Sequence, residues 1–141
     1  MSESNIDLVV FGGLGDLAGR KLLPALYPIE RAGLFAESIR VAIVAREDIE
    51  TSGFLRYAEE RLKASLPAED WSDAVWARLG RRCSYLKIDF SNQKQFEVLS
   101  AWTLPSRVLI YYLATPPSLF GAISQHLQAA GCLDDNARIV L

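Results

Sequence analysis

Residues 8–18 of the chain read LVVFGGLGDLA, an apolar run that stops at a pair of glycines. The run Leu8–Phe11 is apolar without alternation, which is typical of a parallel strand covered on both faces. A tight turn from strand into helix requires a glycine at Gly12, because the backbone there leaves the conformations that other residues adopt. The stretch therefore predicts a strand, a glycine turn and the start of a helix.

The helix after this turn is expected from about Asp16 to Ala32, where apolar residues recur near the helical period. Gly33 stands at the position where glycine commonly ends a helix. Pro24 and Pro28 interrupt the segment, and each removes a backbone donor. We therefore expect a kink, or two short helices in place of one straight helix.

The remainder of the chain continues to alternate strands with helices. Further strands are expected at residues 40–45, 83–90, 108–114 and 137–141, and further helices at 54–66, 71–79, 96–102 and 119–130. Apolar and polar residues alternate in 83–90, which indicates a strand nearer the margin of the sheet, whereas 108–114 is apolar throughout and is expected to be buried.

This alternation predicts an α/β fold of the Rossmann-like, doubly wound type, with a parallel sheet in the order 3-2-1-4-5. The ligand crevice is expected at the carboxyl ends of strands one and four. We expect one domain over residues 1–141, and a sheet that is incomplete at its C-terminal edge because the sequence stops on an apolar strand.

The composition is that of a folded cytoplasmic domain. The 141 residues are 50% hydrophobic and 23% charged with a net charge of -2, which argues against disorder and against a nucleic-acid partner. Cys83, Cys132 and one histidine leave little for a disulfide framework or a metal site. The N-terminus does not read as a secretory signal, and the longest apolar run, Val108–Ala114, is too short for a membrane span.

The glycine turn is the candidate site for a coenzyme pyrophosphate. Its expected cofactor-binding residues are Gly12, Gly13, Leu14, Gly15, Asp16 and Leu17. Gly15 stands where the helix starts, so that a phosphate can approach the first free amides, and Ala18 is small enough for close packing. Asp16 favours the helix dipole and shapes the loop. The spacing is GxxGxxA where GxGxxG is commoner, and a bare tight turn remains the alternative.

Two other nucleotide-binding classes are disfavoured. A P-loop needs Gly-Lys-Ser/Thr, but Gly19 is followed by Arg20 and Lys21. The short-chain dehydrogenases use a tyrosine with a lysine four residues later, and this chain has no such pair.

The stretch FGGLGDLAGRKLLPALY, residues 11–27, resembles the N-terminal fingerprint of glucose-6-phosphate dehydrogenases. That pattern is a G-x-x-G-D-L-A turn followed by a basic pair and a proline, and it is met at Gly12, Gly15, Asp16, Leu17, Ala18, Arg20, Lys21 and Pro24. The resemblance continues through RVAIVAR, LKIDF and YLATPPSLFGAI. It implies the coenzyme domain of an enzyme that oxidises glucose 6-phosphate at C1 with NADP.

Arg46 decides the coenzyme. NAD-binding domains of this type carry Asp or Glu at the end of the second strand, where it binds the ribose 2′-hydroxyl. A guanidinium suits a 2′-phosphate, and the resemblance implies that contact. The alternatives are a solvated surface arginine and, because Glu47 and Asp48 follow, weaker phosphate preference with NAD as a second coenzyme.

Other coenzyme contacts are implied only by the resemblance. They are Asp89 and Phe90 after the third strand, and Ala114 and Thr115 after the fourth. Asp89 has the alternative of belonging to the N-cap region of the helix that begins near Asn92.

Four further side chains have simpler expected roles than catalysis. Lys21 stands where the family has a basic residue near the active site, and a solvated helix lysine is the alternative. His126 is expected to be a partly exposed helix histidine, while Cys83 and Cys132 are expected to be core thiols.

No catalytic residue is expected within the chain. The resemblance places the base and the sugar-phosphate ligands beyond Leu141, together with the family's substrate domain and its homo-oligomer surface. Residues 1–141 alone are therefore expected to be inactive toward glucose 6-phosphate. The alternatives are a non-catalytic NAD(P)-binding module and an inactive fragment.

Overall fold

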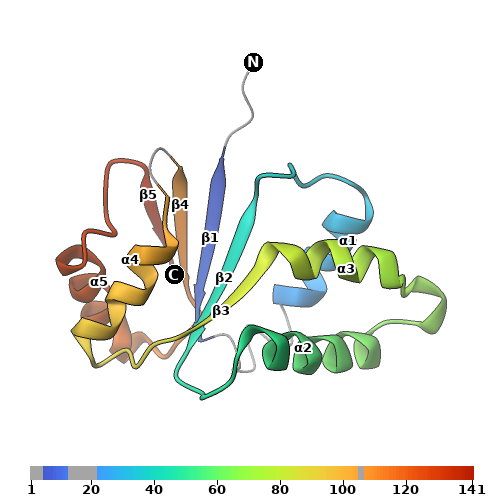
Figure 1. The fold of residues 1–141 in the computed structure, drawn as a ribbon, viewed down its shortest axis with the longest axis horizontal. Coiled ribbons are helices and arrows are strands. Elements are labelled where there is room, and N and C mark those ends of the chain that lie inside the picture. Colours follow the sequence, from blue (N-terminus) through green and yellow to red (C-terminus); the bar gives the residue numbers. More distant parts are fainter. Residues whose placement is uncertain (1–4, 13–21, 105–106) are drawn as a thin grey trace.

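The sheet has the predicted strands and the predicted order. The computed structural model describes residues 5–12, 22–104 and 107–141. Its strands are β1 (Ile6–Phe11), β2 (Arg40–Ala45), β3 (Cys83–Lys87), β4 (Val108–Leu113) and β5 (Ala137–Val140). All neighbouring pairs are parallel, in the order β3-β2-β1-β4-β5. The doubly wound α/β fold is confirmed, with β3 at one margin as expected (Figure 1).

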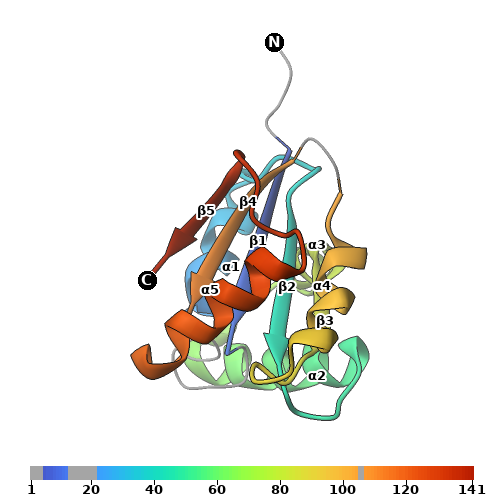
Figure 2. The same cartoon turned by 90° about the vertical axis from the view of Figure 1, so that its left-hand side faces the viewer.

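Helices cover both faces of this sheet. They are α1 (Leu23–Arg31), α2 (Thr51–Ser65), α3 (Asp73–Arg82), α4 (Glu97–Trp102) and α5 (Phe120–Ala129), with short 3-10 turns η2 (Ala68–Asp70), η3 (Gln93–Phe96) and η4 (Pro117–Leu119). The first three helices lie on one side of the sheet, and α4 and α5 lie on the other (Figures 1 and 2). No helix within the described ranges is both long and apolar enough to cross a bilayer.

The alternation of side chains along β1 separates two hydrophobic cores. Val10 packs into the core shared with α1, α2 and α3, whereas Val9 and Phe11 pack into the core shared with α4 and α5. All three side chains are fully buried. Because both faces of β1 are covered, its run of apolar residues without alternation is explained.

The prolines do not divide α1 within the described residues. The expected start at Asp16 lies outside them, but from Leu23 onward one helix runs to Arg31, with Pro24 in its first turn and Pro28 inside it. Gly33 follows with a φ of +70°, so the predicted glycine termination is confirmed.

Several expected elements differ in extent or in burial from those observed. Trp71 lies before α3, because Ser72 caps that helix by accepting a hydrogen bond from the Val75 amide. Strand β3 ends at Lys87, three residues earlier than predicted, because the chain then turns at Asp89. Strand β4 was expected to be buried throughout, but burial alternates along it, with only Leu109, Tyr111 and Leu113 inaccessible.

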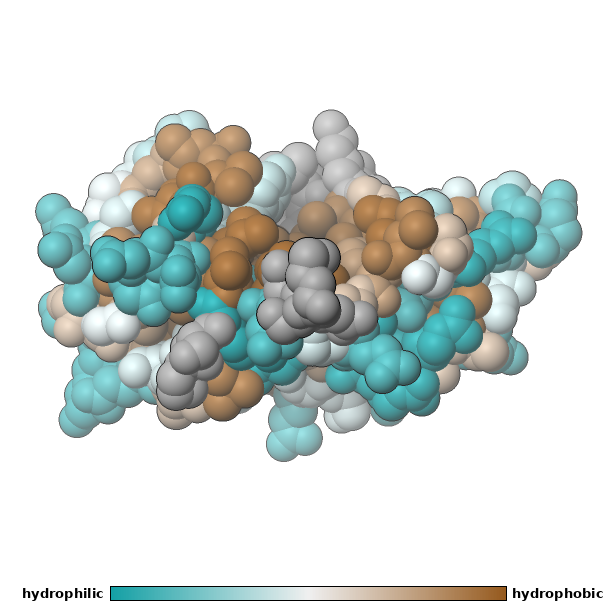
Figure 3. All heavy atoms as spheres, turned by 90° about the horizontal axis from the view of Figure 1, so that it is seen from above, coloured by the Kyte–Doolittle hydropathy of each residue, from teal (hydrophilic) through white to brown (hydrophobic). Residues whose placement is uncertain are grey.

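A buried ion cluster joins the amino-terminal ends of three strands. Asp7 is fully buried, and its carboxylate accepts hydrogen bonds from Arg40 at 2.6 and 3.0 Å and from Arg107 at 2.7 Å. Arg107 also donates to the Ser38 carbonyl oxygen at 2.5 Å. From above, the molecule shows separate apolar areas divided by hydrophilic side chains at this end of the sheet (Figure 3).

Candidate functional site

A hollow of about 480 Å³ lies at the carboxyl ends of β1, β2, β3 and β4, the place where the topology predicts a ligand. It is lined by Gly12, Ala45, Arg46, Glu47, Asp89, Phe90, Ser91, Ala114, Thr115, Pro116 and Leu119. Six predicted cofactor-binding residues thus come together there: Gly12, Arg46, Asp89, Phe90, Ala114 and Thr115. The other five, Gly13, Leu14, Gly15, Asp16 and Leu17, lie outside the described residues.

Gly12 stands at the floor of this crevice under two constraints. Its φ is +97°, in the range that favours glycine, and its amide donates to the Val44 carbonyl oxygen at 2.8 Å. A Cβ atom at this position would lie 2.7 Å from the Ala114 carbonyl oxygen and 3.4 Å from Thr115 Cγ2. The missing side chain therefore keeps β1 and β4 close together where the crevice opens.

Arg46 brings a positive charge to the crevice. It is exposed directly after β2, and among the described residues it forms no ion pair within 4.0 Å. Its charge helps to lower the pKa of Asp89, although the main cause is the pair of hydrogen bonds that this carboxylate accepts from Ser91. Arg46 thus faces the end of β3 across the hollow, with its guanidinium accessible to an anion.

Asp89 holds a turn before η3 and does not cap the helix, which was the alternative to a ligand contact. Its Oδ1 accepts from the Ser91 amide at 3.0 Å and from the Ser91 hydroxyl at 2.7 Å. The cap of η3 itself comes from Asn92, whose side chain accepts from the Lys94 amide at 3.1 Å. One carboxylate oxygen of Asp89 therefore holds the turn that forms one wall of the crevice.

Phe90 gives that wall an apolar surface. Its ring packs edge-on against Phe11, with the ring centroids 5.4 Å apart, and is half-buried in the core shared with α4 and α5. On the opposite wall, the Thr115 hydroxyl donates to the Pro116 carbonyl oxygen at 3.3 Å. A flat apolar ring bearing an anionic group fits a crevice of this chemistry.

Sequence reasoning missed four residues that line the hollow. Ala45 is the last residue of β2, and Ser91, Pro116 and Leu119 follow the ends of β3 and β4. Their residue types carry no ligand signature, but any residue within a few positions of a parallel strand's carboxyl end is a candidate by topology alone.

The predictions for His126, Cys83 and Cys132 are confirmed, whereas Lys21 lies outside the described residues. His126 is partly exposed on α5, with its ring 5.2 Å from that of Phe96. Cys83 and Cys132 are buried free thiols in different cores, on opposite faces of the sheet. Burial raises the pKa of the Cys83 thiol to about 12, so it is not a thiolate nucleophile at neutral pH.

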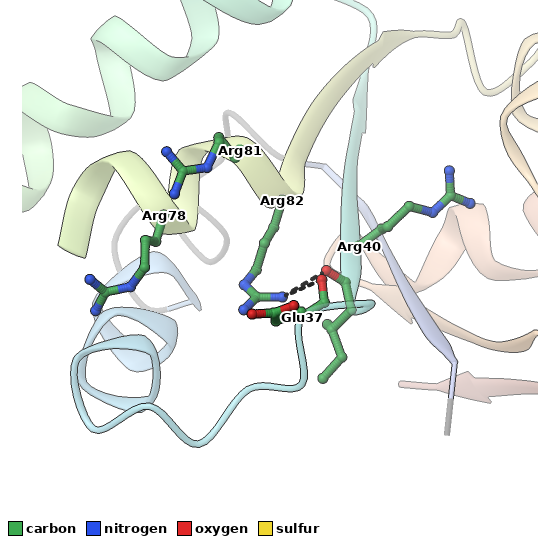
Figure 4. A pocket seen from close by; sticks show the side chains of 6 residues that line it. Glu37, Arg40, Arg78, Arg81 and Arg82 are labelled. Atoms are coloured by element: carbon green, nitrogen blue, oxygen red, sulfur yellow. Dashed lines mark hydrogen bonds between the residues drawn. The ribbon is translucent and has the colours of Figure 1, made fainter. Parts of the chain in front are cut away.

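A second hollow, of about 370 Å³, lies at the amino-terminal ends of β2 and β3 and is rich in arginine. Arg82 donates to Glu30 at 2.6 Å and to the Ala36 carbonyl oxygen at 2.6 Å, while Arg40 binds Asp7. The guanidinium groups of Arg40, Arg78 and Arg81 point in different directions (Figure 4). Arg40, Arg78 and Arg82 form ion pairs that join elements of the fold, and the arginines of this hollow do not converge on one ligand position.

Comparison with known proteins identifies the family to which the chain belongs. Residues 9–141 match the family described as "Glucose-6-phosphate dehydrogenase, NAD binding domain". The glucose-6-phosphate 1-dehydrogenase of Dickeya dadantii is 37% identical over 136 residues, which are 96% of this chain and 28% of the relative. That of Zymomonas mobilis is 30% identical over 142 residues, which are 100% of this chain and 29% of the relative.

A solved structure agrees with these matches. The crystal structure of glucose-6-phosphate 1-dehydrogenase from Mycobacterium avium superposes with a TM-score of 0.88 at 36% identity, covering 98% of this chain and 29% of that one. The chain therefore spans less than a third of the length of these relatives.

Proposed function

Because this chain belongs to the glucose-6-phosphate dehydrogenase family and matches its NAD-binding domain, we propose that residues 1–141 form one domain that binds NADP in the crevice. The observation that carries this proposal is the accessible guanidinium of Arg46 at the end of β2, in the same hollow as Gly12. A guanidinium there is suited to a 2′-phosphate, where a carboxylate would select the free 2′-hydroxyl of NAD.

The residues of the crevice fit the parts of such a coenzyme. Gly12 lacks the Cβ atom that would lie 2.7 Å from the Ala114 carbonyl oxygen, so the end of β1 can pack closely against β4 at the place where the coenzyme would bind. Phe90 offers an apolar surface on the wall next to Arg46, in the position suited to an adenine ring. The contacts expected from the sequence for Gly13, Leu14, Gly15, Asp16 and Leu17 stay predictions for the pyrophosphate.

The reaction of the whole protein follows from this assignment as a proposal. A bound NADP would accept the hydride, and the substrate would be glucose 6-phosphate, oxidised at C1 to the lactone in the first oxidative step of the pentose phosphate pathway. The support is the family match together with the names of the relatives. We place this reaction in the cytoplasm, where the two buried thiols would stay reduced.

Calorimetric titration of the chain with NADP and with NAD tests the coenzyme site. Arg46→Ala is expected to weaken NADP binding by about ten- to a hundred-fold, since it removes charge-assisted hydrogen bonds, and to change NAD binding little. The control is Arg81→Ala, which removes an exposed arginine from the second hollow at the other end of the sheet. Its affinities should equal those of the unchanged chain.

Equal losses of NADP and NAD affinity on Arg46→Ala would contradict the 2′-phosphate assignment. A loss confined to Arg81→Ala would move the coenzyme site to the other hollow.

A further inference from the structure

The loop after β2 carries two acidic residues beside the arginine that is proposed to bind a phosphate. Arg46 is followed at once by Glu47 and Asp48, and all three side chains are exposed. Two carboxylates beside one guanidinium give the loop a net negative charge, which would repel the 2′-phosphate that Arg46 is proposed to bind. A preference for NADP therefore requires that the two carboxylates be restrained or neutralised.

Tyr85 restrains Glu47. The Tyr85 hydroxyl donates to the Glu47 carbonyl oxygen at 2.8 Å and lies 3.5 Å from the Glu47 carboxylate. Tyr85 is only 6% exposed, and its ring stacks on Phe54 of α2 with centroids 5.7 Å apart. Its amide also donates to the hydroxyl of Thr51, the first residue of α2, at 3.0 Å. The loop is thus tied to a buried, rigid side chain of β3.

Lys87 neutralises Asp48. Its ammonium group lies 3.3 Å from the Asp48 carboxylate. Lys87 stands two residues after Tyr85, so both side chains leave the same face of β3, the face covered by α2. The Phe90 wall of the crevice belongs to the core on the opposite face. Both acidic side chains are therefore engaged from the face of β3 opposite the Phe90 wall.

We propose that Tyr85 and Lys87 are positioning residues for coenzyme specificity, which hold Glu47 and Asp48 so that the charge of Arg46 remains available to a 2′-phosphate. This inference rests on the proposed NADP site and adds to it a set of residues outside the hollow. Neither residue is among those that line the hollow.

The test measures the ratio of NADP to NAD affinity by calorimetry. Tyr85→Phe keeps the ring and its stacking but removes the hydroxyl, and it should lower the ratio by about three- to tenfold, the effect of one hydrogen bond. Tyr111→Phe is the matched control, because Tyr111 is also buried and its hydroxyl donates to the Cys132 carbonyl oxygen at 2.7 Å in the core on the other face of the sheet. That control should leave the ratio unchanged.

Double variants test whether a lower ratio arises from the released acidic side chains or from a general loss of structure. In a Glu47→Gln background, Tyr85→Phe should no longer change the ratio, because the charge that Tyr85 restrains is gone. Lys87→Met should lower the ratio in the unchanged chain and lower it less in an Asp48→Asn background. Lys87 is half exposed, so this second pair keeps the test available if Tyr85→Phe does not fold.

Three outcomes would overturn the inference. One is an equal loss of NADP and NAD affinity on Tyr85→Phe, which would indicate a structural role alone. Another is an effect on the ratio that persists unchanged in the Glu47→Gln background. The unchanged chain could prefer NADP while the effect of Tyr85→Phe does not depend on Glu47 and the effect of Lys87→Met does not depend on Asp48. In that case only this inference fails. If the chain binds neither coenzyme, the proposed function fails and this inference fails with it.

Discussion

At the scale of single residues, Gly12 shows how one missing side chain can serve both fold and site. Its positive φ turns the chain out of β1, and the absence of a Cβ atom lets the Ala114 carbonyl oxygen approach. The first requirement is visible in the sequence, because a strand followed by glycine indicates such a turn. The second depends on β4, whose residues lie about a hundred positions later, and no local pattern reports it.

We predict that Gly12→Ala lowers the free energy of unfolding by about 3 kcal/mol or more, since the added methyl is strained by φ and also meets the Ala114 carbonyl oxygen. Gly33→Ala is the control, because Gly33 also has a positive φ but no atom within 4 Å of the added methyl. It should cost only about 1–2 kcal/mol. Urea denaturation measures the free energy of unfolding of both variants. Equal losses would show that β4 can move away from the added methyl group without a loss of stability.

At the scale of elements, α1 keeps a proline where helices rarely tolerate one. Pro28 lies inside the helix, where it has no amide to donate to the Pro24 carbonyl oxygen and its ring crowds that oxygen. Packing compensates, because Leu23, Leu26 and Tyr27 are buried in the core beneath the helix. Tertiary contacts thus hold together a segment that the sequence predicted to bend or divide.

Pro28→Ala is therefore expected to stabilise the chain. Pro28 is exposed, so its replacement leaves the core unchanged, adds one helical hydrogen bond and removes a steric clash. The gain should be about 1–2 kcal/mol, after allowance for the greater freedom of the unfolded chain. Pro24→Ala should gain less, since an amide in the first turn has no helical partner. Thermal unfolding followed by circular dichroism compares them, and a lower melting temperature for Pro28→Ala would refute the argument.

What could be predicted from the sequence depends on how far apart along the chain the interacting residues lie. The order of elements could be predicted, because apolar runs and glycine or proline breaks are local features. The six described crevice residues could also be predicted: Gly12 and Arg46 from the ends of the first two strands, and Asp89, Phe90, Ala114 and Thr115 from the family resemblance. The contacts of Tyr85 with Glu47 and of Arg40 with Asp7 could not, because they join residues 38 and 33 positions apart without any periodic pattern.

At the scale of the whole molecule, polar groups are divided between the two ends of the sheet. The carboxyl ends carry accessible charges around the crevice, including Arg46 and Asp89. The amino ends carry charges that neutralise one another, chiefly Asp7 with Arg40 and Arg107. Arg40 also stacks over the Trp102 ring, 4.0 Å from its centre. One end therefore holds the strands together, while the other is left open for a ligand.

The buried cluster leads to a prediction for the stability of the whole domain. Asp7→Asn is expected to lower the free energy of unfolding by about 3–5 kcal/mol, because Arg40 and Arg107 would keep their charges in a largely buried position without the carboxylate that balances them. Asp70→Asn provides the control, since Asp70 forms a longer surface pair with Arg31 at 3.6 Å, and its loss should cost about 0.5 kcal/mol or less.

Urea denaturation measures the free energy of unfolding of the two variants. Calorimetric titration of folded Asp7→Asn with NADP measures its coenzyme affinity. Because the cluster lies at the end of the sheet opposite the crevice, coenzyme affinity should stay within about twofold of the unchanged chain while stability falls. A stability loss as small as that of Asp70→Asn would mean that solvent reaches the two guanidinium groups and screens them. A large loss of coenzyme affinity in the folded variant would mean instead that β1 and β4 shift as rigid units, carrying the displacement from Asp7 through to Gly12 and Ala114.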